Sequence, residues 1–432
     1  MKTAAPIALA TIAALVLWAA LVGFGARHGW ARAMPAAIGD TKGFMQFAKE
    51  RYATESKGNI VIVLLNHGEV AATYCDSHGR AVDVNSLFQV ASLSKWLTAW
   101  GVMALVEQHR IDLDAPVDRY LTRWHLPLGA FDNAGVTVRR LLSHTAGLTD
   151  GLGFRGFAPG ETLPRIDEEL SNAADAMPES SGLVRVGAQP GSTWRYSGGG
   201  YLILQLLIED VTHESFNDYM RRAVFLPLGM TESTFVNPDP SEVADFYAPD
   251  GSIAIHYKFV ALAAASLYTS ASDLTRLIQA QLVGSNDESP GRGVLRPKTL
   301  RIMRTPQAFL FRQPVWGLGQ ALFAPDGNGG YVTGHDGGNY PAINTTARID
   351  PANGNGVIVL ETGARTLASE IGGAWTYWQT GTVPLDTLVI FDARVILIQF
   401  AVGALTIVCV SILFFRRARR HKRGAIPVPM KV

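Results

Sequence analysis

Ser92 and Lys95 stand three positions apart, where an apolar segment leads into a predicted helix. On a helix this spacing puts both side chains on one face, so they can meet. A serine hydroxyl is a weak nucleophile until a base takes its proton, and a lysine can be that base when burial or nearby cations lower its pKa. A helix start also aims backbone N–H groups at a developing oxyanion. By itself the pair is a weak signal, because two such residues also meet by chance at an ordinary helix start with a solvated lysine.

Two glycine-rich segments give the pair its context. Residues 190–201 form a turn that carries Tyr196 just before a predicted helix. Residues 333–338 end a short predicted strand that carries His335, and their glycines allow another backbone to approach closely.

The segments together resemble the serine β-lactamase and penicillin-binding superfamily. The likeness is to its branch of class C β-lactamases, D-Ala-D-Ala carboxypeptidases and related esterases, and it extends from about Phe44 to Gly363 in order and with similar spacing. Ser92-Leu93-Ser94-Lys95 matches the first motif, Tyr196-Ser197-Gly198 matches the second (Tyr-x-Asn in the family), and His335-Asp336-Gly337 matches the third (Lys-Thr-Gly in β-lactamases, His-x-Gly in some carboxypeptidases).

The resemblance implies roles for these residues. Ser92 would form the acyl-enzyme, Lys95 would take the serine proton, and the Tyr196 hydroxyl would pass protons to and from the leaving group. The N–H groups of Ser92 and Gly338 would form the oxyanion hole, and His335 would help to hold the carboxylate or carbonyl end of the substrate. The predicted site therefore contains catalytic Ser92, Lys95 and Tyr196, with Gly338, His335, Gly337 and Gly198 around the oxyanion and substrate. The competing hypotheses are a core aromatic for Tyr196 and a purely structural strand residue for His335.

Two departures from the family pattern bear on the substrate. Gly198 stands where an asparagine would hydrogen-bond the substrate amide and the lysine, and losing such a contact can change discrimination by orders of magnitude. His335 replaces a permanent cation with a titratable group. Both departures weaken a β-lactamase interpretation and suit a peptidase or an esterase better. Asp336 would disfavour a carboxylate substrate if its side chain faced the site.

Other motifs do not support a different chemistry. His144 could be a base, but the resemblance implies a structural loop near the site for residues 141–148. The G-x-G-x-x-G run at 151–156 has no strand before it, and Pro159 follows where a helix should run, so we reject a dinucleotide site. We find no G-x-S-x-G, no H-E-x-x-H and no Cys/His cluster in the sequence, and we predict no metal and no cofactor. A formal net charge of +1 gives no reason to expect nucleic-acid binding.

Both ends of the chain are apolar. Residues 4–25 and 395–415 carry no charge, and each is long enough to span a bilayer. Residues 416–432 are basic and are predicted to be a cytoplasmic tail that follows a stop-transfer helix. We therefore predict a signal anchor over 1–26, a hydrolase domain over 40–385 and a transmembrane helix over 395–415, with the domain on the outer face of the cell inner membrane. A cleaved signal peptide is the alternative, because Ala31-Arg32-Ala33 matches an A-x-A cleavage site.

The hydrophobic pattern predicts the strands and helices that hold the site residues. Strands are expected over 60–65 and 70–74, joined by the turn 66–69, and over 342–349 and 356–361, joined by the turn 351–355. Helices are expected over 94–108, 201–211, 216–226, 271–282 and 364–379. This pattern predicts an α+β fold in which early and late strands share one antiparallel sheet, flanked by helices and carrying a mostly helical inserted subdomain.

The sequence thus predicts a serine hydrolase that works through an acyl-enzyme on Ser92. Its substrate would be a small molecule or a peptide, with cell-wall peptides or D-amino-acid compounds first, as for a D-alanyl-D-alanine carboxypeptidase. A promiscuous carboxylesterase or weak β-lactamase is the enzymatic alternative. A non-catalytic membrane receptor or scaffold for cell-wall fragments is the alternative of another class, although a binder has no need of a Ser-Lys-Tyr proton pathway.

Overall fold

The computed structural model describes residues 4–151, 153–178 and 180–424. The chain divides into two compact units. The larger unit is Pro35–Thr380, and the smaller unit combines Met1–Met34 with Gly381–Val432. Every predicted site residue lies in the larger unit.

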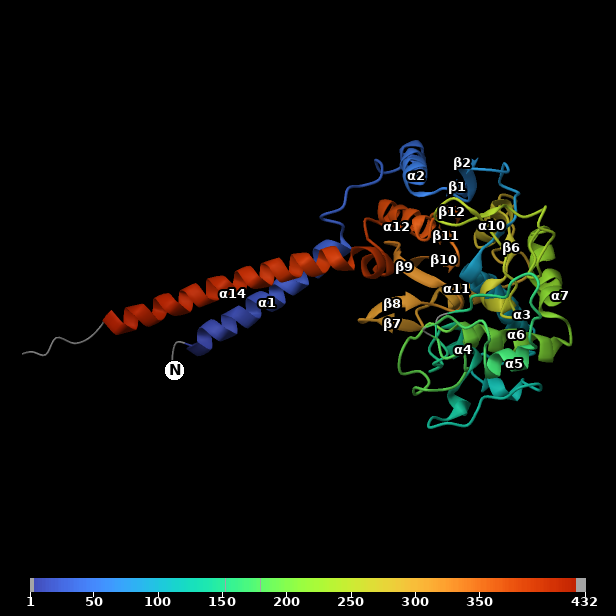
Figure 1. Cartoon of the computed structure of the whole chain (residues 1–432), viewed down its shortest axis with the longest axis horizontal. Helices are drawn as coiled ribbons and strands as arrows, with labels where there is room; N and C mark the ends of the chain where they lie inside the picture. The colour runs from blue at the N-terminus through green and yellow to red at the C-terminus, as the bar shows by residue number, and fades with distance from the viewer. Residues whose placement is uncertain (1–3, 152, 179, 425–432) are drawn as a thin grey trace, which may run out of the picture. The chain divides into compact units, whose positions relative to one another are not determined.

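The larger unit is built on an antiparallel sheet whose strand order, in the described part of the chain, is β2-β1-β12-β11-β10-β9-β8-β7 (Figure 1). Its strands are β1 (Asn59–Asn66), β2 (Glu69–Ser77), β7 (Ala308–Leu310), β8 (Gln313–Trp316), β9 (Ala321–Pro325), β10 (Tyr331–Asn339), β11 (Ile343–Asp350) and β12 (Asn355–Thr362). Since β1 pairs with β12, the prediction that early and late strands share one sheet is confirmed.

Two tight turns fix the register of this sheet. Between β1 and β2, His67 and Gly68 both have left-handed backbone angles (φ 50° and 82°), which suits a two-residue hairpin. Between β11 and β12 the turn closes with Gly354 at φ 77°. Both predicted hairpins are therefore present. Strands β7 to β9 were not predicted because they have only three, four and five residues and show no clear alternation.

Strand β1 is buried on both faces, which explains its unbroken apolar sequence. Val61 and Val63 point into the core shared with the helical part of the unit, whereas Ile60 and Ile62 point into a second core. The second core lies under α2 (Thr41–Glu55) and α12 (Leu367–Thr380), which share one face of the sheet, and Phe44 stacks on Trp378 there at 4.9 Å (Figure 1).

The inserted part is mostly helical, as predicted. Its helices are α3 (Ser94–Glu107), α4 (Val138–Leu142), α5 (Ile166–Ser171), α6 (Gly198–Thr212), α7 (Phe216–Met220), α8 (Leu226–Leu228), α9 (Leu262–Ala265), α10 (Ala271–Gln279) and α11 (Pro297–Arg304), and its short strands are β3 (Phe88–Gln89), β4 (Phe246–Tyr247), β5 (Ile253–Ala254) and β6 (Tyr268–Thr269). The helix predicted over 216–226 is helical throughout but contains a π-turn at Arg221–Phe225. The helix predicted over 201–211 starts earlier, at Gly198, because the Ser197 side chain caps it.

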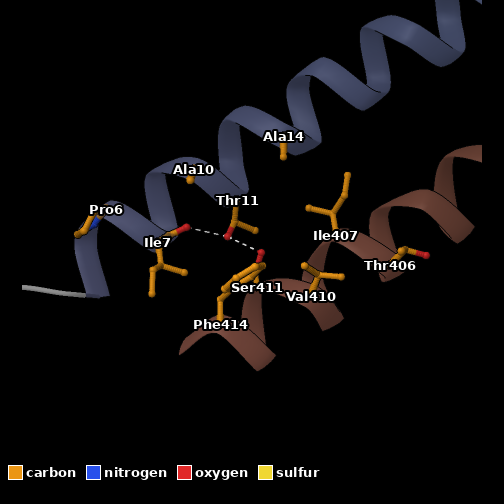
Figure 2. A pocket seen from close by; sticks show the side chains of 10 residues that line it. All are labelled: Pro6, Ile7, Ala10, Thr11, Ala14, Thr406, Ile407, Val410, Ser411 and Phe414. Atoms are coloured by element: carbon orange, nitrogen blue, oxygen red, sulfur yellow. Dashed lines mark hydrogen bonds between the residues drawn. The ribbon is translucent and has the colours of Figure 1, made fainter. Parts of the chain in front are cut away.

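The smaller unit contains two helices that are long and apolar enough, by length and composition, to cross a membrane. They are α1 (Ala4–Arg27) and α14 (Ala393–Gly424), with the short α13 (Leu385–Thr387) before α14. The two long helices run antiparallel, because Thr11 hydrogen-bonds Ser411 at 2.8 Å while Trp18 donates to the carbonyl of Phe400 at 3.2 Å. Figure 2 shows the Thr11–Ser411 pair inside a groove lined mainly by apolar side chains. Residues 425–432 of the predicted basic tail lie outside the described residues.

A pair of buried carboxyl groups lies in the helical part of the larger unit. Glu169 on α5 and Asp175 are only 1% and 3% exposed, and Asp175 accepts a hydrogen bond from the Gly156 backbone N–H at 2.9 Å. Burial, together with the neighbouring Asp175 as the smaller cause, raises the pKa of Glu169 to about 9. Glu169 therefore stays protonated in the folded protein at neutral pH.

We expect this proton to make stability depend on pH. The folded pKa of Glu169, about 9, lies above its ordinary value of 4.5, so its contribution is complete below pH 4.5 and is lost as the pH rises toward 9. The free energy of unfolding should fall by at most ~1.4 kcal/mol per pH unit in that window. Urea unfolding of the detergent-solubilised full chain should show this slope, and Glu169→Gln should flatten it. The exposed control Glu50→Gln should keep the wild-type slope, and identical slopes in all three proteins would contradict the assignment.

Candidate active site

Ser92 and Lys95 meet at the start of α3. Ser92 lies in the short 3₁₀ turn η1 (Ala91–Leu93), which directly precedes α3, so the helical spacing predicted for the pair is present. The Lys95 ammonium nitrogen Nζ lies 3.1 Å from Ser92 Oγ and 2.7 Å from the carbonyl oxygen of Ala264 on α9. Ala91 holds a left-handed backbone angle (φ 47°), an uncommon conformation that the packing around the turn must stabilise.

The charge state of Lys95 is set by burial. The side chain is 2% exposed, and desolvation lowers the pKa of its amine to about 7. Asp150 acts in the opposite direction and raises that pKa by Coulomb attraction, but it is the smaller effect. A large fraction of Lys95 is therefore a neutral amine near pH 7, within hydrogen-bonding distance of a serine hydroxyl, and can accept its proton.

Tyr196 reaches the same place from the turn before α6. The Ser197 side chain caps α6, and Asp150 fixes that cap by accepting hydrogen bonds from Ser197 Oγ at 2.5 Å and from the Gly199 N–H at 2.8 Å. Burial raises the pKa of the Tyr196 phenol, while a hydrogen bond with Ser92 lowers it. Lys95 Nζ lies 5.0 Å from the centre of the Tyr196 ring. The structure thus brings the three predicted catalytic side chains together.

Gly198 follows the tyrosine motif as the first residue of α6, and it is buried. A Cβ placed on Gly198 would lie 2.9 Å from a ring carbon of Phe154. The space of the family's asparagine is therefore closed by the aromatic ring of Phe154, which lies outside the helices and strands. Gly198 can contribute a backbone group at the start of a helix but no side chain.

Strand β10 forms another wall of the site. From His335 onward it pairs with β11 only, since its pairing with β9 ends at Gly334. Gly337 packs directly on the turn that holds Ser92, because a Cβ at Gly337 would lie 2.1 Å from the Val90 carbonyl oxygen. Gly338 is exposed, and only distant contacts of 3.9 Å and beyond surround its Cβ position. The predicted residues of the third motif are therefore beside Ser92.

His335 and Asp336 point to opposite faces of β10, as neighbours on a strand do. His335 is 3% exposed and lies in ring contact with Tyr196 and Trp316, at centroid distances of 6.4 and 5.2 Å. Desolvation and the nearby Lys95 charge lower the pKa of His335 to about 3. Asp336 instead forms an ion pair with the buried Arg348 at 2.7 Å on the far face. The orientation of Asp336 could not be predicted from the sequence. In the structure its carboxylate points away from Ser92.

His144 packs against the tyrosine of the site. Its ring centre lies 4.3 Å from that of Tyr196, and its Nδ1 accepts a hydrogen bond from the Ser197 N–H at 3.2 Å. These contacts support the interpretation of His144 as a structural residue of a loop near the site. Burial lowers its pKa well below the ordinary value.

Sequence reasoning did not identify several groups that shape the site. These are the carboxylate of Asp150, the carbonyl of Ala264, the ring of Phe154 and the indole of Trp316. Phe154 lies inside the rejected G-x-G-x-x-G run, and the other three stand in no recognisable motif. Each reaches the site through tertiary packing. No group of three or more His, Cys, Asp or Glu side chains that could hold a metal ion occurs among the described residues.

Comparison with known proteins places this geometry in a family. The Beta-lactamase family model matches residues 45–382. Penicillin-binding protein 4* of Bacillus subtilis (strain 168) is 35% identical over 39% of this chain and 35% of its own length. Esterase EstB of Burkholderia gladioli is 29% identical over 43% of this chain and 48% of its own length. The chain therefore spans less than half of the length of these two curated relatives.

A solved structure agrees on the fold. The D-stereospecific amidohydrolase of a Streptomyces species superimposes with a TM-score of 0.60, covering 79% of this chain and 99% of that chain at 20% identity. The predicted α+β fold, with the antiparallel sheet and the inserted helices, is confirmed, and so is the resemblance from which it was predicted.

The lowered pKa of Lys95 predicts how Ser92 should react with pH. A fluorophosphonate should label Ser92 roughly tenfold faster at pH 8 than at pH 6, because the fraction of neutral Lys95 rises through a pKa of about 7. Lys95→Met should slow labelling by about 100-fold or more and remove this rise. Lys57→Ala, at an exposed lysine, should behave as wild type. A labelling rate that is flat between pH 6 and 8 in the wild type would contradict the role of Lys95.

Proposed function

The chain belongs to the Beta-lactamase family, and from this we propose that it is a serine hydrolase that forms an acyl-enzyme on Ser92. The observation that carries the proposal is the contact between Ser92 Oγ and the buried Lys95 amine, at 3.1 Å. A lysine removed from water is costly to keep charged, and the three-residue proton pathway has no use in a simple binding protein. This contact favours an enzyme over a non-catalytic receptor or scaffold.

The proposed reaction has two halves. Lys95 takes the proton of Ser92 as Oγ attacks the substrate carbonyl carbon, and the bond to the leaving group breaks as Tyr196 protonates it. The proton on Lys95 then passes to the Tyr196 phenolate, which returns both groups to their starting states. A water molecule attacks the carbonyl carbon of the ester as Lys95 takes its proton, the bond from that carbon to Ser92 Oγ breaks as Tyr196 protonates Oγ, and the acid product leaves. Transfer of the proton from Lys95 to Tyr196 again completes the cycle. The backbone N–H groups of Ser92 and Gly338 are proposed to bind the oxyanion.

Two substrate classes remain candidates. Cell-wall peptides and D-amino-acid compounds fit a location outside the cytoplasm, and they are supported by relatives named as penicillin-binding protein and D-stereospecific amidohydrolase. Carboxylic esters are the second candidate. The ring of Phe154 against Gly198 favours them, because the asparagine that would recognise a substrate amide is replaced by an apolar surface. The relative named as an esterase supports the same candidate.

We further propose that α1 is a retained membrane anchor and that the hydrolase unit lies outside the inner membrane. Polar contacts between α1 and α14 support retention, because Thr11–Ser411 is a hydrogen bond between two otherwise apolar helices. Arg32, the middle residue of the potential cleavage site, is ion-paired with Asp392 at 2.6 Å. The basic residues that follow Phe415 would keep the C-terminus in the cytoplasm.

The proposed nucleophile is tested by replacement and by two probes. Ser92→Ala should lower kcat/KM for a p-nitrophenyl ester by at least ~10³-fold and abolish labelling by a fluorescent penicillin, since no other group supplies the attacking oxygen. Ser252→Ala, in an exposed turn, should keep wild-type values. In the wild type, a stable penicillin adduct would favour a peptidase, and fast ester turnover without an adduct would favour an esterase. Full activity in Ser92→Ala would refute the assignment.

The membrane proposal predicts an uncleaved chain. Intact-mass analysis of protein extracted from membranes should give the full 46.6 kDa. Protease added to intact spheroplasts should digest the hydrolase unit. Protection of that unit in intact spheroplasts would contradict the topology, and a mass lacking the first helix would show that α1 is a cleaved signal peptide.

A further inference from the structure

A groove runs along the helix pair of the smaller unit, between residues 6–14 of α1 and residues 406–414 of α14. Figure 2 shows Ala10 and Ala14 on the α1 side of the groove and Ile407 and Val410 on the α14 side. The groove has a volume of about 550 Å³, within the roughly 300–1,000 Å³ of sites that hold one small ligand. The reaction proposed at Ser92 makes no use of it.

The groove offers a hydrocarbon surface to a ligand. Three of its lining residues carry hydroxyls, and each hydroxyl already has a hydrogen-bond partner in the helix pair. Thr11 Oγ1 lies 2.8 Å from both the Ile7 carbonyl oxygen and Ser411 Oγ. Thr406 Oγ1 lies 2.9 Å from the Val402 carbonyl oxygen. Because these polar atoms are paired, an apolar chain suits the groove better than a polar group.

The groove is too narrow to seat another whole helix. It follows α1 from Pro6 to Ala14, a rise of about 12 Å. Its volume over that length gives a mean cross-section of about 45 Å², whereas a helix about 10 Å wide occupies roughly 80 Å². Beyond the groove the two helices are in direct contact, since a Cβ at Gly403 would lie 2.1 Å from a ring carbon of Trp18. An extended hydrocarbon chain therefore fits the groove better than a helix does.

Arginines follow the groove at the other end. Arg416 and Arg417 are exposed and come directly after the apolar run that ends at Phe415. Arg417 lies three residues after Phe414 and seven after Val410, so it continues the side of α14 that lines the groove. Neither α1 nor α14 contains Asp or Glu, so the helix pair supplies no carboxylate to these arginines. An anionic group at this end of the groove would meet positive charge that neither helix neutralises.

We propose that the groove binds an anionic phospholipid of the cytoplasmic leaflet, with one acyl chain between α1 and α14 and the headgroup phosphate on Arg416 and Arg417. This goes beyond the reaction at Ser92. It rests on the membrane topology proposed above, because cleavage of α1 would remove one wall of the groove. In that topology the two arginines lie at the cytoplasmic surface, where anionic lipids attract basic residues.

The headgroup decides which lipid is preferred. Lipid tails are as apolar as the groove, so an acyl chain gains packing there but little from the hydrophobic effect. Each arginine near the membrane surface strengthens the attraction for anionic lipid by about fivefold in affinity. Two arginines at the end of the groove therefore favour an anionic lipid over a zwitterionic lipid with the same tails.

Two lipids with identical tails test the proposal in the full-length, detergent-solubilised protein. Native mass spectrometry gives the affinity for dioleoylphosphatidylglycerol, which is anionic, and for dioleoylphosphatidylcholine, which is zwitterionic. The wild type should bind the anionic lipid about tenfold or more tightly. Arg416→Gln combined with Arg417→Gln should bring the affinity ratio near one. Lys422→Gln combined with Arg423→Gln removes the same charge about 9 Å further along α14 and should keep the wild-type ratio.

Filling the groove tests where the acyl chain lies. Ala10→Phe puts a ring into the groove without a change of charge and should weaken binding of both lipids by about tenfold. Ala8→Phe adds the same ring at an exposed position of α1 outside the groove and should bind as the wild type does. In wild-type protein in phosphatidylglycerol vesicles, a phosphatidylglycerol with a diazirine in its acyl chain should crosslink to residues 6–14 and 406–414. The crosslinking decides the location even if Ala10→Phe separates the two helices.

Equal affinity for the two lipids, or the same loss from both pairs of charge substitutions, would show general attraction to a basic tail and overturn the proposal. Crosslinks between the groove residues of two chains would also overturn it, because a second copy would then occupy the groove. An intact mass that lacks α1 would remove the site together with the retained anchor, whereas a full-length chain that fails the lipid tests would refute the lipid site alone. Fluorophosphonate labelling of Ser92 in the same samples reports on the proposed hydrolase reaction separately.

Discussion

A lysine held out of water is the constraint on which the rest of the site depends. Lys95 can act as a base only if its ammonium form is destabilised, and the buried start of α3 achieves this without removing every hydrogen-bond partner. The Ala264 carbonyl and Ser92 Oγ hold the amine in place. A direct ion pair would undo the effect by favouring the charged form. The one nearby carboxylate that raises the pKa of Lys95, Asp150, has its oxygens engaged at the N-terminus of α6 instead.

The need to keep water away from Lys95 also accounts for how the sheet packs against the helices. Gly337 lets β10 lie directly on the Val90 carbonyl, and Thr345 on the neighbouring strand donates to the same oxygen at 3.0 Å. This packing excludes water from one side of the turn that carries Ser92. His144 and His335, both near Lys95, then stay neutral because burial and a shared positive neighbour act together. Of these three groups, Lys95 is therefore the one whose charge changes near pH 7.

Features that depend on neighbouring residues could be predicted from the sequence, whereas contacts between distant residues could not be predicted from local patterns. Hairpins, apolar strands and the buried helix α3 are encoded by local patterns, and the motif residues around Ser92, Tyr196 and His335 were found because they stand in short recognisable segments. Their meeting was expected from family resemblance, since no local pattern brings positions so far apart together. Phe154 and Trp316 could not be predicted, because a ring that enters a site from a loop or a four-residue strand leaves no periodic signature. The orientation of Asp336 needed the register of β10 against β11, which places it beside Arg348.

The two departures from the family pattern have a common physical meaning once their surroundings are known. Taken separately, a glycine for an asparagine and a histidine for a lysine could indicate an active site that has decayed. Decay would leave a vacancy at Gly198 and an unconstrained ring at His335. Instead, Phe154 fills the space at Gly198 with a ring, and the Asp336 carbonyl fixes the proton of His335. Both changes replace polar or charged recognition by neutral surfaces while Ser92, Lys95 and Tyr196 stay in contact. The two altered positions are therefore packed and hydrogen-bonded parts of the fold beside Ser92, which is not what decay of an active site would leave.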